Sequence, residues 1–243
     1  MQATSLENKV ILITGATRGI GEATAKALDQ LGATLLLVGR EKERLQTLAD
    51  SLGDAVAIQG DLCQEGAIES LTNTAKRYGP IYGLVQSAGV ARNSSVLDGD
   101  TAQWETMWRI NVMALASVAQ AILPLMPDSG GHVIHLGSMS GTRVPPSGGF
   151  YACTKFAVRG LTEALRLELR AAGNPTRVTL VSPGFVETDM AAGYLADRGQ
   201  RIEDLGYDIL QAEDVAQTIA HAMTAPAHVD VNEINLRSAR QSV

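Results

Sequence analysis

Two side chains in the second half of the sequence have types and a spacing suited to acid–base chemistry. Tyr151 and Lys155 lie four positions apart in a pattern that predicts a helix, so both are expected on one helix face. A free tyrosine has a pKa of about 10, and a neighbouring ammonium group would stabilise the phenolate and lower that pKa. Such a phenol could donate or accept a proton. The same spacing is common by chance, so on its own it favours an ordinary helix face.

A glycine-rich turn near the N-terminus could bind a phosphate group. Residues 14–21, TGATRGIG, follow a β-rich run and lead directly into a helical pattern. Glycines let the backbone turn sharply and approach a diphosphate, while a helix N-terminus supplies unpaired N–H groups and partial positive charge. In this strand–turn–helix context the turn indicates a dinucleotide site, with a tight turn that binds nothing as the alternative.

The end of the second β-rich run bears on the choice between NAD and NADP. An NAD-specific protein usually places an acidic residue there, whereas this run ends in Gly39 and Arg40. Arg18 and Arg40 lie in the two turns expected beside the adenosine ribose, where two guanidinium groups could bind a 2′-phosphate. The sequence therefore predicts NADP(H), against the alternative of two ordinary solvated arginines. Asp61 follows the third run, where it could accept from the adenine amino group or cap the next helix.

Short β-rich runs alternate with longer helical patterns along the chain, which is typical of βαβ units. Strands are expected at residues 10–14, 34–38, 55–59, 83–87, 132–136, 177–181 and 233–236, and helices at 19–31, 41–52, 64–78, 104–123, 150–172 and 213–223. The predicted fold is a Rossmann-type three-layer α/β/α sandwich with a doubly wound, mainly parallel sheet of about seven strands. Residues 1–243 are interpreted as one domain. Within it, residues 187–210 form a long connection and a candidate substrate lid.

Composition narrows the class of protein. Hydrophobic residues make up 45% of the chain and aromatic residues only 4%, which suits buried parallel strands covered by helices. A net charge of −6 gives no broad attraction to nucleic acid or anionic lipid. Two cysteines are too few for a disulfide framework, and the four histidines show no metal-ligand spacing. A polar N-terminus and the lack of a stretch approaching about 18 apolar residues predict a cytoplasmic protein without a membrane span.

Several further motifs make residues 9–190 resemble the short-chain dehydrogenase/reductase family, with weaker likeness beyond. The glycine turn has the family's Thr-Gly-x-x-x-Gly-x-Gly spacing, and Ser138 ends a predicted strand thirteen positions before Tyr151. Asn111 lies in a long predicted helix, and Pro183-Gly184 and Thr188 follow a later strand. The resemblance implies an oxidoreductase that transfers hydride between NADP(H) and a carbonyl or secondary alcohol.

The resemblance also assigns roles to residues. Tyr151 would be the general acid/base, and Ser138 would stabilise charge on the substrate oxygen. Lys155 would hold the nicotinamide ribose and lower the tyrosine pKa, while Asn111 would position a water that relays protons. The residues expected around NADP(H) are Gly15, Thr17, Arg18, Gly19, Ile20, Gly21, Arg40, Asp61, Leu62, Ser87, Ala88, Gly89, Tyr151, Lys155, Pro183, Gly184, Val186 and Thr188. No metal is implied.

The chain departs from the family pattern after the fourth predicted strand. The usual Asn-Asn-Ala-Gly is replaced by residues 86–89, QSAG. Ala88 and Gly89 still allow close approach to the adenosine ribose. The structural role of the second asparagine would fall to Ser87 or to another residue, which puts local stability in doubt more than catalysis.

The sequence is compatible with two classes of substrate. Residues 138–145, 150–151, 161–163 and 232–237 resemble broad-substrate cytosolic carbonyl reductases, including ketosteroid-reducing members. A β-ketoacyl carrier-protein reductase is the alternative, although Ser129 and Ala172 stand where such enzymes often present arginines. Residues 187–210 carry six acidic and two basic side chains, which would repel an acidic carrier protein. A small neutral carbonyl therefore ranks first. The apolar tip of this segment, residues 190–195, could close over the substrate or form an amphipathic helix that covers the core.

Two further interpretations concern the class of protein and its partners. A non-catalytic NADP(H)-binding sensor on the same fold is possible, but the intact catalytic set argues against it. The resemblance implies a homodimer or homotetramer, formed through the long helices that contain Asn111 and Tyr151. Apolar residues on these helices could form that interface or could only pack against the sheet; they are Ala114, Leu115, Val118, Ala157, Leu161 and Leu165.

Overall fold

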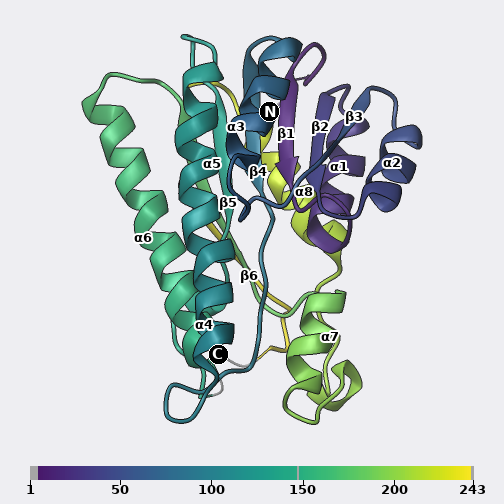
Figure 1. Cartoon of the computed structure of the whole chain (residues 1–243), viewed down its shortest axis with the longest axis vertical. Helices are drawn as coiled ribbons and strands as arrows, with labels where there is room; N and C mark the ends of the chain where they lie inside the picture. The colour runs from purple at the N-terminus through teal and green to yellow at the C-terminus, as the bar shows by residue number, and fades with distance from the viewer. Residues whose placement is uncertain (1–4, 147, 242–243) are drawn as a thin grey trace.

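A seven-stranded, wholly parallel sheet lies between two layers of helices in the computed structural model, which describes residues 5–146 and 148–241 (Figure 1). The strand order is β3-β2-β1-β4-β5-β6-β7. The strands are β1 (Val10–Thr14), β2 (Thr34–Gly39), β3 (Ala55–Gln59), β4 (Ile81–Gln86), β5 (His132–Leu136), β6 (Arg177–Pro183) and β7 (Glu233–Leu236). The predicted Rossmann-type α/β/α sandwich is thus confirmed, and each strand lies within two residues of its expected place.

Successive residues of a strand pack alternately into two hydrophobic cores, one on each face of the sheet. Ile11 and Ile13 of β1 pack with helical residues from 19–29, 42–50 and 212–223, whereas Leu12 packs on the opposite face with residues from 67–75, 115–122 and 149–171. This alternation follows from the two-residue period of a strand. The helices are α1 (Gly19–Asp29), α2 (Lys42–Asp50), α3 (Ala67–Ala75), α4 (Thr101–Trp108), α5 (Leu115–Ile122), α6 (Gly149–Ala171), α7 (Asp189–Ala196) and α8 (Ala212–Met223).

The long helix expected at residues 104–123 consists of three segments. It begins earlier, at Thr101, because the Asp100 carboxylate accepts a hydrogen bond from the Ala102 N–H at 2.9 Å and caps α4. A π-helical stretch, η2 (Arg109–Ala114), joins α4 to α5. Single π turns are frequent at functional sites, and this one contains Asn111.

The same helix corrects an expectation about membrane spans. Thr101–Leu125 is long and apolar enough to cross a membrane by length and composition, although the sequence suggested no such stretch. The reason is that a helix with few charged residues reaches the required mean hydropathy without an unbroken apolar run. In this fold its α5 part is buried under the sheet through Val118, Ala119 and Ile122, as in the core helix of a globular domain.

The apolar residues proposed for a subunit interface lie mostly inside the fold. Leu115 and Val118 are buried, and both pack within the chain. The large apolar side chains that α4, η2 and α6 do expose are different ones, namely Trp108, Met113, Phe156 and Leu167. Oligomerisation through these helices stays a prediction.

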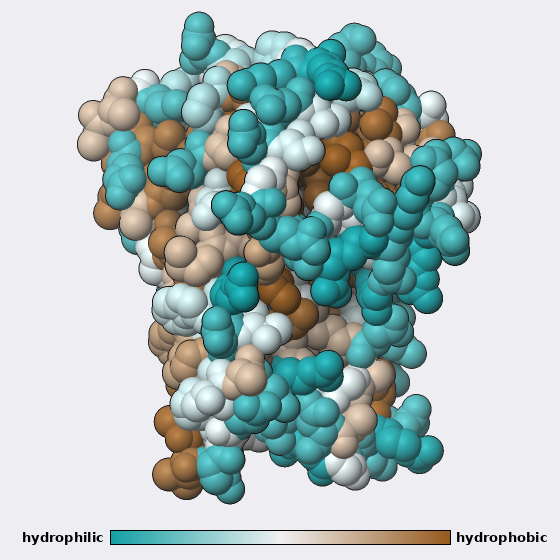
Figure 2. Space-filling model, viewed as in Figure 1, coloured by the Kyte–Doolittle hydropathy of each residue, from teal (hydrophilic) through white to brown (hydrophobic). Residues whose placement is uncertain are grey.

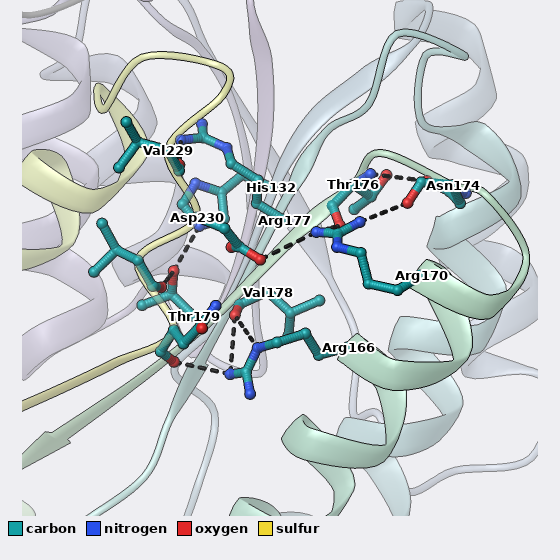
Figure 3. A network of polar contacts seen from close by, with 12 residues as sticks. His132, Arg166, Arg170, Asn174, Thr176, Arg177, Val178, Thr179, Val229 and Asp230 are labelled. Carbon is teal, nitrogen blue, oxygen red and sulfur yellow. Dashed lines mark hydrogen bonds and ion pairs between the residues drawn. The ribbon is translucent and has the colours of Figure 1, made fainter.

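Arginines near the end of α6 and at the start of β6 anchor the connection into β7 (Figure 3). Arg177 Nη1 donates to the carbonyl oxygens of Ala225 and Val229, at 3.1 Å each. Arg170 of α6 donates to the Thr176 carbonyl at 3.0 Å and forms an ion pair with Asp230 at 3.1 Å. Guanidinium groups thus satisfy main-chain carbonyls that no strand or helix pairs. This network positions β7 and the residues that follow it.

His132 lies beside this arginine network, buried in the sheet. Its Nε2 is 2.7 Å from the Thr179 hydroxyl, which donates its own proton to the Val231 carbonyl. The histidine must therefore carry a proton on Nε2. Burial, aided by the charge of Arg177, lowers the pKa of His132 to about 3.

Residues 187–210 extend from the sheet and return to it, and they contain more regular secondary structure than the long connection that the sequence predicts. Glu187 N–H donates to the Leu210 carbonyl at 2.8 Å, and Leu210 N–H donates to the Phe185 carbonyl at 3.1 Å. The excursion contains α7 and a short 3-10 helix, η5 (Ile202–Leu205). Its closed base holds α7 against the carboxyl edge of the sheet. Whether it moves as a lid stays a prediction.

Candidate active site

Two adjoining cavities lie at the carboxyl ends of the strands, where the order of a doubly wound sheet reverses between β1 and β4. The first, here the Tyr151 cavity, has a volume of about 410 Å³ and is lined by Ser138, Tyr151 and Lys155 among others. The second, the Gly15 cavity, has a volume of about 370 Å³ and is lined by the glycine turn, Arg40 and Asp61. Both are lined by Ile20, Ser87, Gly89 and Thr188, so together they form one elongated site. Figure 2 shows a hollow in the middle of this view, with hydrophobic residues inside it.

The glycine turn leaves the start of α1 open to the Gly15 cavity. Gly15 has a φ of +70°, and a Cβ at this position would lie 2.7 Å from the Ala88 nitrogen. A Cβ on Gly21 would overlap the Gly15 carbonyl oxygen. The turn therefore accepts no side chains at these positions, which lets a diphosphate approach the N-terminus of α1. These features fit the dinucleotide that the sequence predicts.

The segment after β4 is fastened by residues other than Ser87. The Gln86 side-chain amide donates to the Leu115 carbonyl at 2.8 Å and ties β4 to α5. Asn111 Oδ1 accepts from the Val90 N–H at 2.8 Å, while its amide donates to the Val90 carbonyl at 2.9 Å. Gln86 and Asn111 thus supply the structural link that the altered QSAG motif left open. The expected water relay by Asn111 stays a prediction.

The two arginines expected at a 2′-phosphate differ in their surroundings. Arg18 forms an ion pair with Glu41 and lies 3.6 Å from the carboxylate of Asp189. Arg40 also lines the Gly15 cavity, and its guanidinium has no ion-pair partner in the described part of the chain. Arg40 is therefore the more available of the two for an anion.

Glu41 was missed by the sequence analysis. The second β-rich run does end without an acid, but Glu41 comes one position after Arg40, precedes α2 and lines the Gly15 cavity. Its charge is balanced by Arg18 and by Arg44, whose Nε lies 3.2 Å from the carboxylate. A bound phosphate would compete with Glu41 for Arg18.

Asp61 and Leu62 both line the Gly15 cavity. Asp61 Oδ1 accepts from the Cys63 N–H at 3.1 Å, within its own turn. The alternative role as a helix cap is wrong, because α3 begins only at Ala67, after Gly66 in a left-handed conformation. A contact with adenine stays a prediction.

Tyr151, Ser138 and Lys155 meet in the Tyr151 cavity as expected. Tyr151 lies in the first turn of α6, and it lines the same cavity as Ser138, whose side chain lowers the pKa of the phenol. Lys155 Nζ donates to the Leu136 carbonyl at 2.8 Å and lies 5.9 Å from the centre of the Tyr151 ring. The Tyr194 ring of α7 packs 6.0 Å from that of Tyr151.

The pKa of Tyr151 moves in the direction opposite to that expected. Burial raises it to about 12, although the hydrogen bond from Ser138 partly offsets this effect. Burial also lowers the pKa of Lys155 to about 8. In this structure, removal from water outweighs any stabilisation of the phenolate by the ammonium group. Tyr151 is thus a protonated phenol at neutral pH.

The segment after β6 and the C-terminal tail close the site. Pro183, Gly184, Val186 and Thr188 all line the Tyr151 cavity, as the resemblance implied. Arg237 and Gln241 also line it, and sequence reasoning missed both. The tail is fastened by two bonds: Gly184 N–H donates to the Leu236 carbonyl at 2.8 Å, and Phe185 N–H donates to Gln241 Oε1 at 3.3 Å. No motif in the sequence signals this return of the tail.

A model of the short chain dehydrogenase family matches residues 9–199, most of the chain. The chain belongs to the short-chain dehydrogenase family. It is 37% identical to an uncharacterized oxidoreductase from Staphylococcus epidermidis over 235 residues, which are 96% of this chain and 98% of that one. A relative from Staphylococcus aureus, also an uncharacterized oxidoreductase, is 36% identical over 238 residues, covering 96% and 99%.

Solved structures of two other dehydrogenases share the fold over nearly the whole chain. The closed form of a serine dehydrogenase complexed with NADP+ has a TM-score of 0.89 and 32% identity, covering 96% of each chain. An alcohol dehydrogenase from the archaeon Thermococcus sibiricus, complexed with 5-hydroxy-NADP, has a TM-score of 0.85 and 27% identity, covering 97% of this chain and 98% of that one. This short-chain dehydrogenase is therefore an oxidoreductase whose structural neighbours bind NADP-type cofactors.

Proposed function

We propose that this oxidoreductase is an NADP(H)-dependent enzyme that interconverts a carbonyl compound and a secondary alcohol, with Tyr151 as its acid/base. One observation carries the proposal: Tyr151, Ser138 and Lys155 line a single cavity that adjoins the glycine turn. Two hydroxyl groups that converge on one point can both act on a single substrate oxygen. The structural neighbours complexed with NADP+ and 5-hydroxy-NADP support the choice of cofactor.

The residues that would hold NADP(H) extend along both cavities. Arg40 and Arg18 would hold the 2′-phosphate, the N-terminus of α1 would face the diphosphate, and Lys155 would hold the nicotinamide ribose. Residues 183–188 would flank the nicotinamide. When bound, the reduced nicotinamide supplies the hydride.

The chain's own side chains would handle the proton and the charge. Because its pKa is raised to about 12, Tyr151 holds a proton at neutral pH and can donate it to a carbonyl oxygen. Ser138 would donate a hydrogen bond to the same oxygen and stabilise its developing negative charge. The Lys155 ammonium, 5.9 Å from the Tyr151 ring, would stabilise the phenolate left behind until it regains a proton from water. At neutral pH the buried phenol is thus in the protonated form that reduction of a carbonyl requires.

The proposal is tested by following NADPH and NADH absorbance in parallel over diketones, aromatic aldehydes, ketosteroids and a β-ketoacyl thioester. The expected result is NADPH-dependent reduction of a small carbonyl compound. Preference for the thioester would favour a carrier-protein reductase instead. Binding of NADPH without turnover of any substrate would favour a non-catalytic sensor.

A further inference from the structure

Three arginines from distant parts of the chain line the Tyr151 cavity. They are Arg143, five residues after Ser138, Arg198, two residues after the end of α7, and Arg237, the first residue after β7. No aspartate or glutamate lines this cavity in the part of the chain that the structure describes. The cavity next to the proposed acid/base is therefore strongly basic.

This separation of charge runs against the composition of the protein. The chain has 26 acidic and 20 basic side chains, so a cavity lined at random would contain both kinds. The excursion over residues 187–210 shows the sorting most clearly, because all six of its acidic side chains are exposed and none lines the Tyr151 cavity, whereas Arg198 does. A cleft lined by charge of one sign concentrates oppositely charged ligands.

The arginines of the cavity also differ from the arginines that hold the fold together. Figure 3 shows Arg166, Arg170 and Arg177 each bonded to main-chain carbonyls. By contrast, the guanidinium groups of Arg143, Arg198 and Arg237 have neither a hydrogen-bond nor an ion-pair partner among residues 5–146 and 148–241. Their donors are free to bind an anion in the cavity.

The main chain beside each of these arginines is fixed. Arg143 N–H donates to the Met139 carbonyl at 3.2 Å, and Arg198 N–H donates to the Leu195 carbonyl at 2.9 Å. Arg237 follows Leu236, whose carbonyl accepts from Gly184, and the tail beyond it is fastened by Gln241. Side chains on fixed supports lose less freedom when they bind a ligand.

We propose that the substrate of this enzyme is a small carbonyl compound or alcohol that carries a carboxylate, held by Arg143, Arg198 and Arg237. The proposal rests on the proposed function in that the same cavity holds the reacting oxygen beside Tyr151. Guanidinium groups suit this ligand because their planar donors match the two oxygens of a carboxylate. It departs from the neutral substrate that the sequence favoured, since that ranking depended on acidic residues that face solvent.

Binding tests the anion site without requiring turnover. Succinate and its uncharged diamide, succinamide, are titrated calorimetrically into the protein saturated with NADP+, so that the 2′-phosphate site is already filled. Succinate is expected to bind at least tenfold more tightly than succinamide. The variant Arg143→Gln/Arg198→Gln/Arg237→Gln should lose that preference, and the exposed Arg77→Gln, outside both cavities, should keep it. Equal binding of the two compounds, or an unchanged triple variant, would overturn the proposal.

Turnover separates this inference from the proposed function. Pairs of 2-oxo and 3-oxo acids and their methyl esters are compared as substrates with NADPH. The acid is expected to have a kcat/KM at least tenfold above its ester in the wild type, and the triple variant should lose activity on the acid while activity on the ester changes less than about threefold. Reduction of esters in preference to acids would overturn the inference and leave the proposed function standing. Arginine-dependent binding of succinate without reduction of any carbonyl would overturn the proposed function and leave the carboxylate-binding site standing.

Discussion

Replacing Arg40 with alanine should weaken NADPH binding and leave NADH binding nearly unchanged. Arg40 lines the Gly15 cavity and has no carboxylate partner among the described residues, so its donors are available to a 2′-phosphate. A hydrogen bond to a charged group contributes about 1.5–3 kcal/mol, which corresponds to a loss of roughly 10- to 100-fold in affinity for NADPH. NADH lacks that phosphate, and its Kd should change by less than about threefold.

Glu41 provides a second, opposite perturbation of the same site. Its carboxylate holds Arg18, so Glu41→Gln should free that guanidinium and tighten NADPH binding by a few fold. Arg44→Ala is the matched control, because Arg44 also pairs with Glu41 but lines neither cavity. Fluorescence titrations of the wild type and of all three variants with NADPH and NADH give the dissociation constants to be compared. Equal weakening of both cofactors by Arg40→Ala, or weaker NADPH binding in Glu41→Gln, would refute the reasoning.

Two further predictions concern buried titratable groups. Burial lowers the Lys155 pKa from 10.5 to about 8, so between these values the unfolded state binds more protons and the free energy of unfolding rises with pH. Below pH 8 the buried charge of Lys155 lowers the free energy of unfolding by about 3 kcal/mol. Lys155→Met removes this charge but also loses the hydrogen bond to the Leu136 carbonyl, so at pH 7 urea denaturation should show it to be more stable than the wild type by about 2 kcal/mol. This difference in stability should disappear toward pH 10. An exposed control, Lys76→Met, should show neither effect. The His132 pKa falls from 6.5 to about 3, so stability is lost as pH drops through that window, by up to roughly 4–5 kcal/mol. His132→Gln keeps a donor for Thr179 without the titration, and circular dichroism should show it unfolding at lower pH than the wild type; an unchanged midpoint would argue against this origin of acid sensitivity.

Local patterns in the sequence were sufficient for the strands, most helices and the glycine turn. The turn at residues 14–21 is encoded by its own glycines, and the sharp turn that the sequence suggested takes the form of a left-handed Gly15 with a φ of +70°. Helix α7 agrees with the alternative of an amphipathic helix at residues 190–195, although residues 187–210 as a whole are polar and give no clear helical period. The late start of α3 depends on Gly66, whose left-handed conformation delays the helix.

The parts of the site that sequence reasoning missed depend on contacts between distant residues. Arg237 and Gln241 reach the cavity only because β7 pairs with β6 and the tail then packs on Phe185. The pKa of Tyr151 was misjudged because sequence reveals its neighbour Lys155 but not that the fold partly removes the phenol from water. Glu41 directly follows Arg40, with which the second β-rich run ends, and only the structure shows that its carboxylate forms an ion pair with Arg18.

Deuteride transfer with and without the Tyr151 hydroxyl tests the central claim most directly. The wild type and Tyr151→Phe are incubated with NADPH deuterated at the transferring position and with the best carbonyl substrate of the panel, and the alcohol is analysed by mass spectrometry. The wild type should place one deuterium on the alcohol carbon. Tyr151→Phe should bind NADPH with nearly the same Kd but lose at least about a thousandfold in kcat, because it cannot donate the proton. Retention of wild-type turnover by Tyr151→Phe would contradict the account.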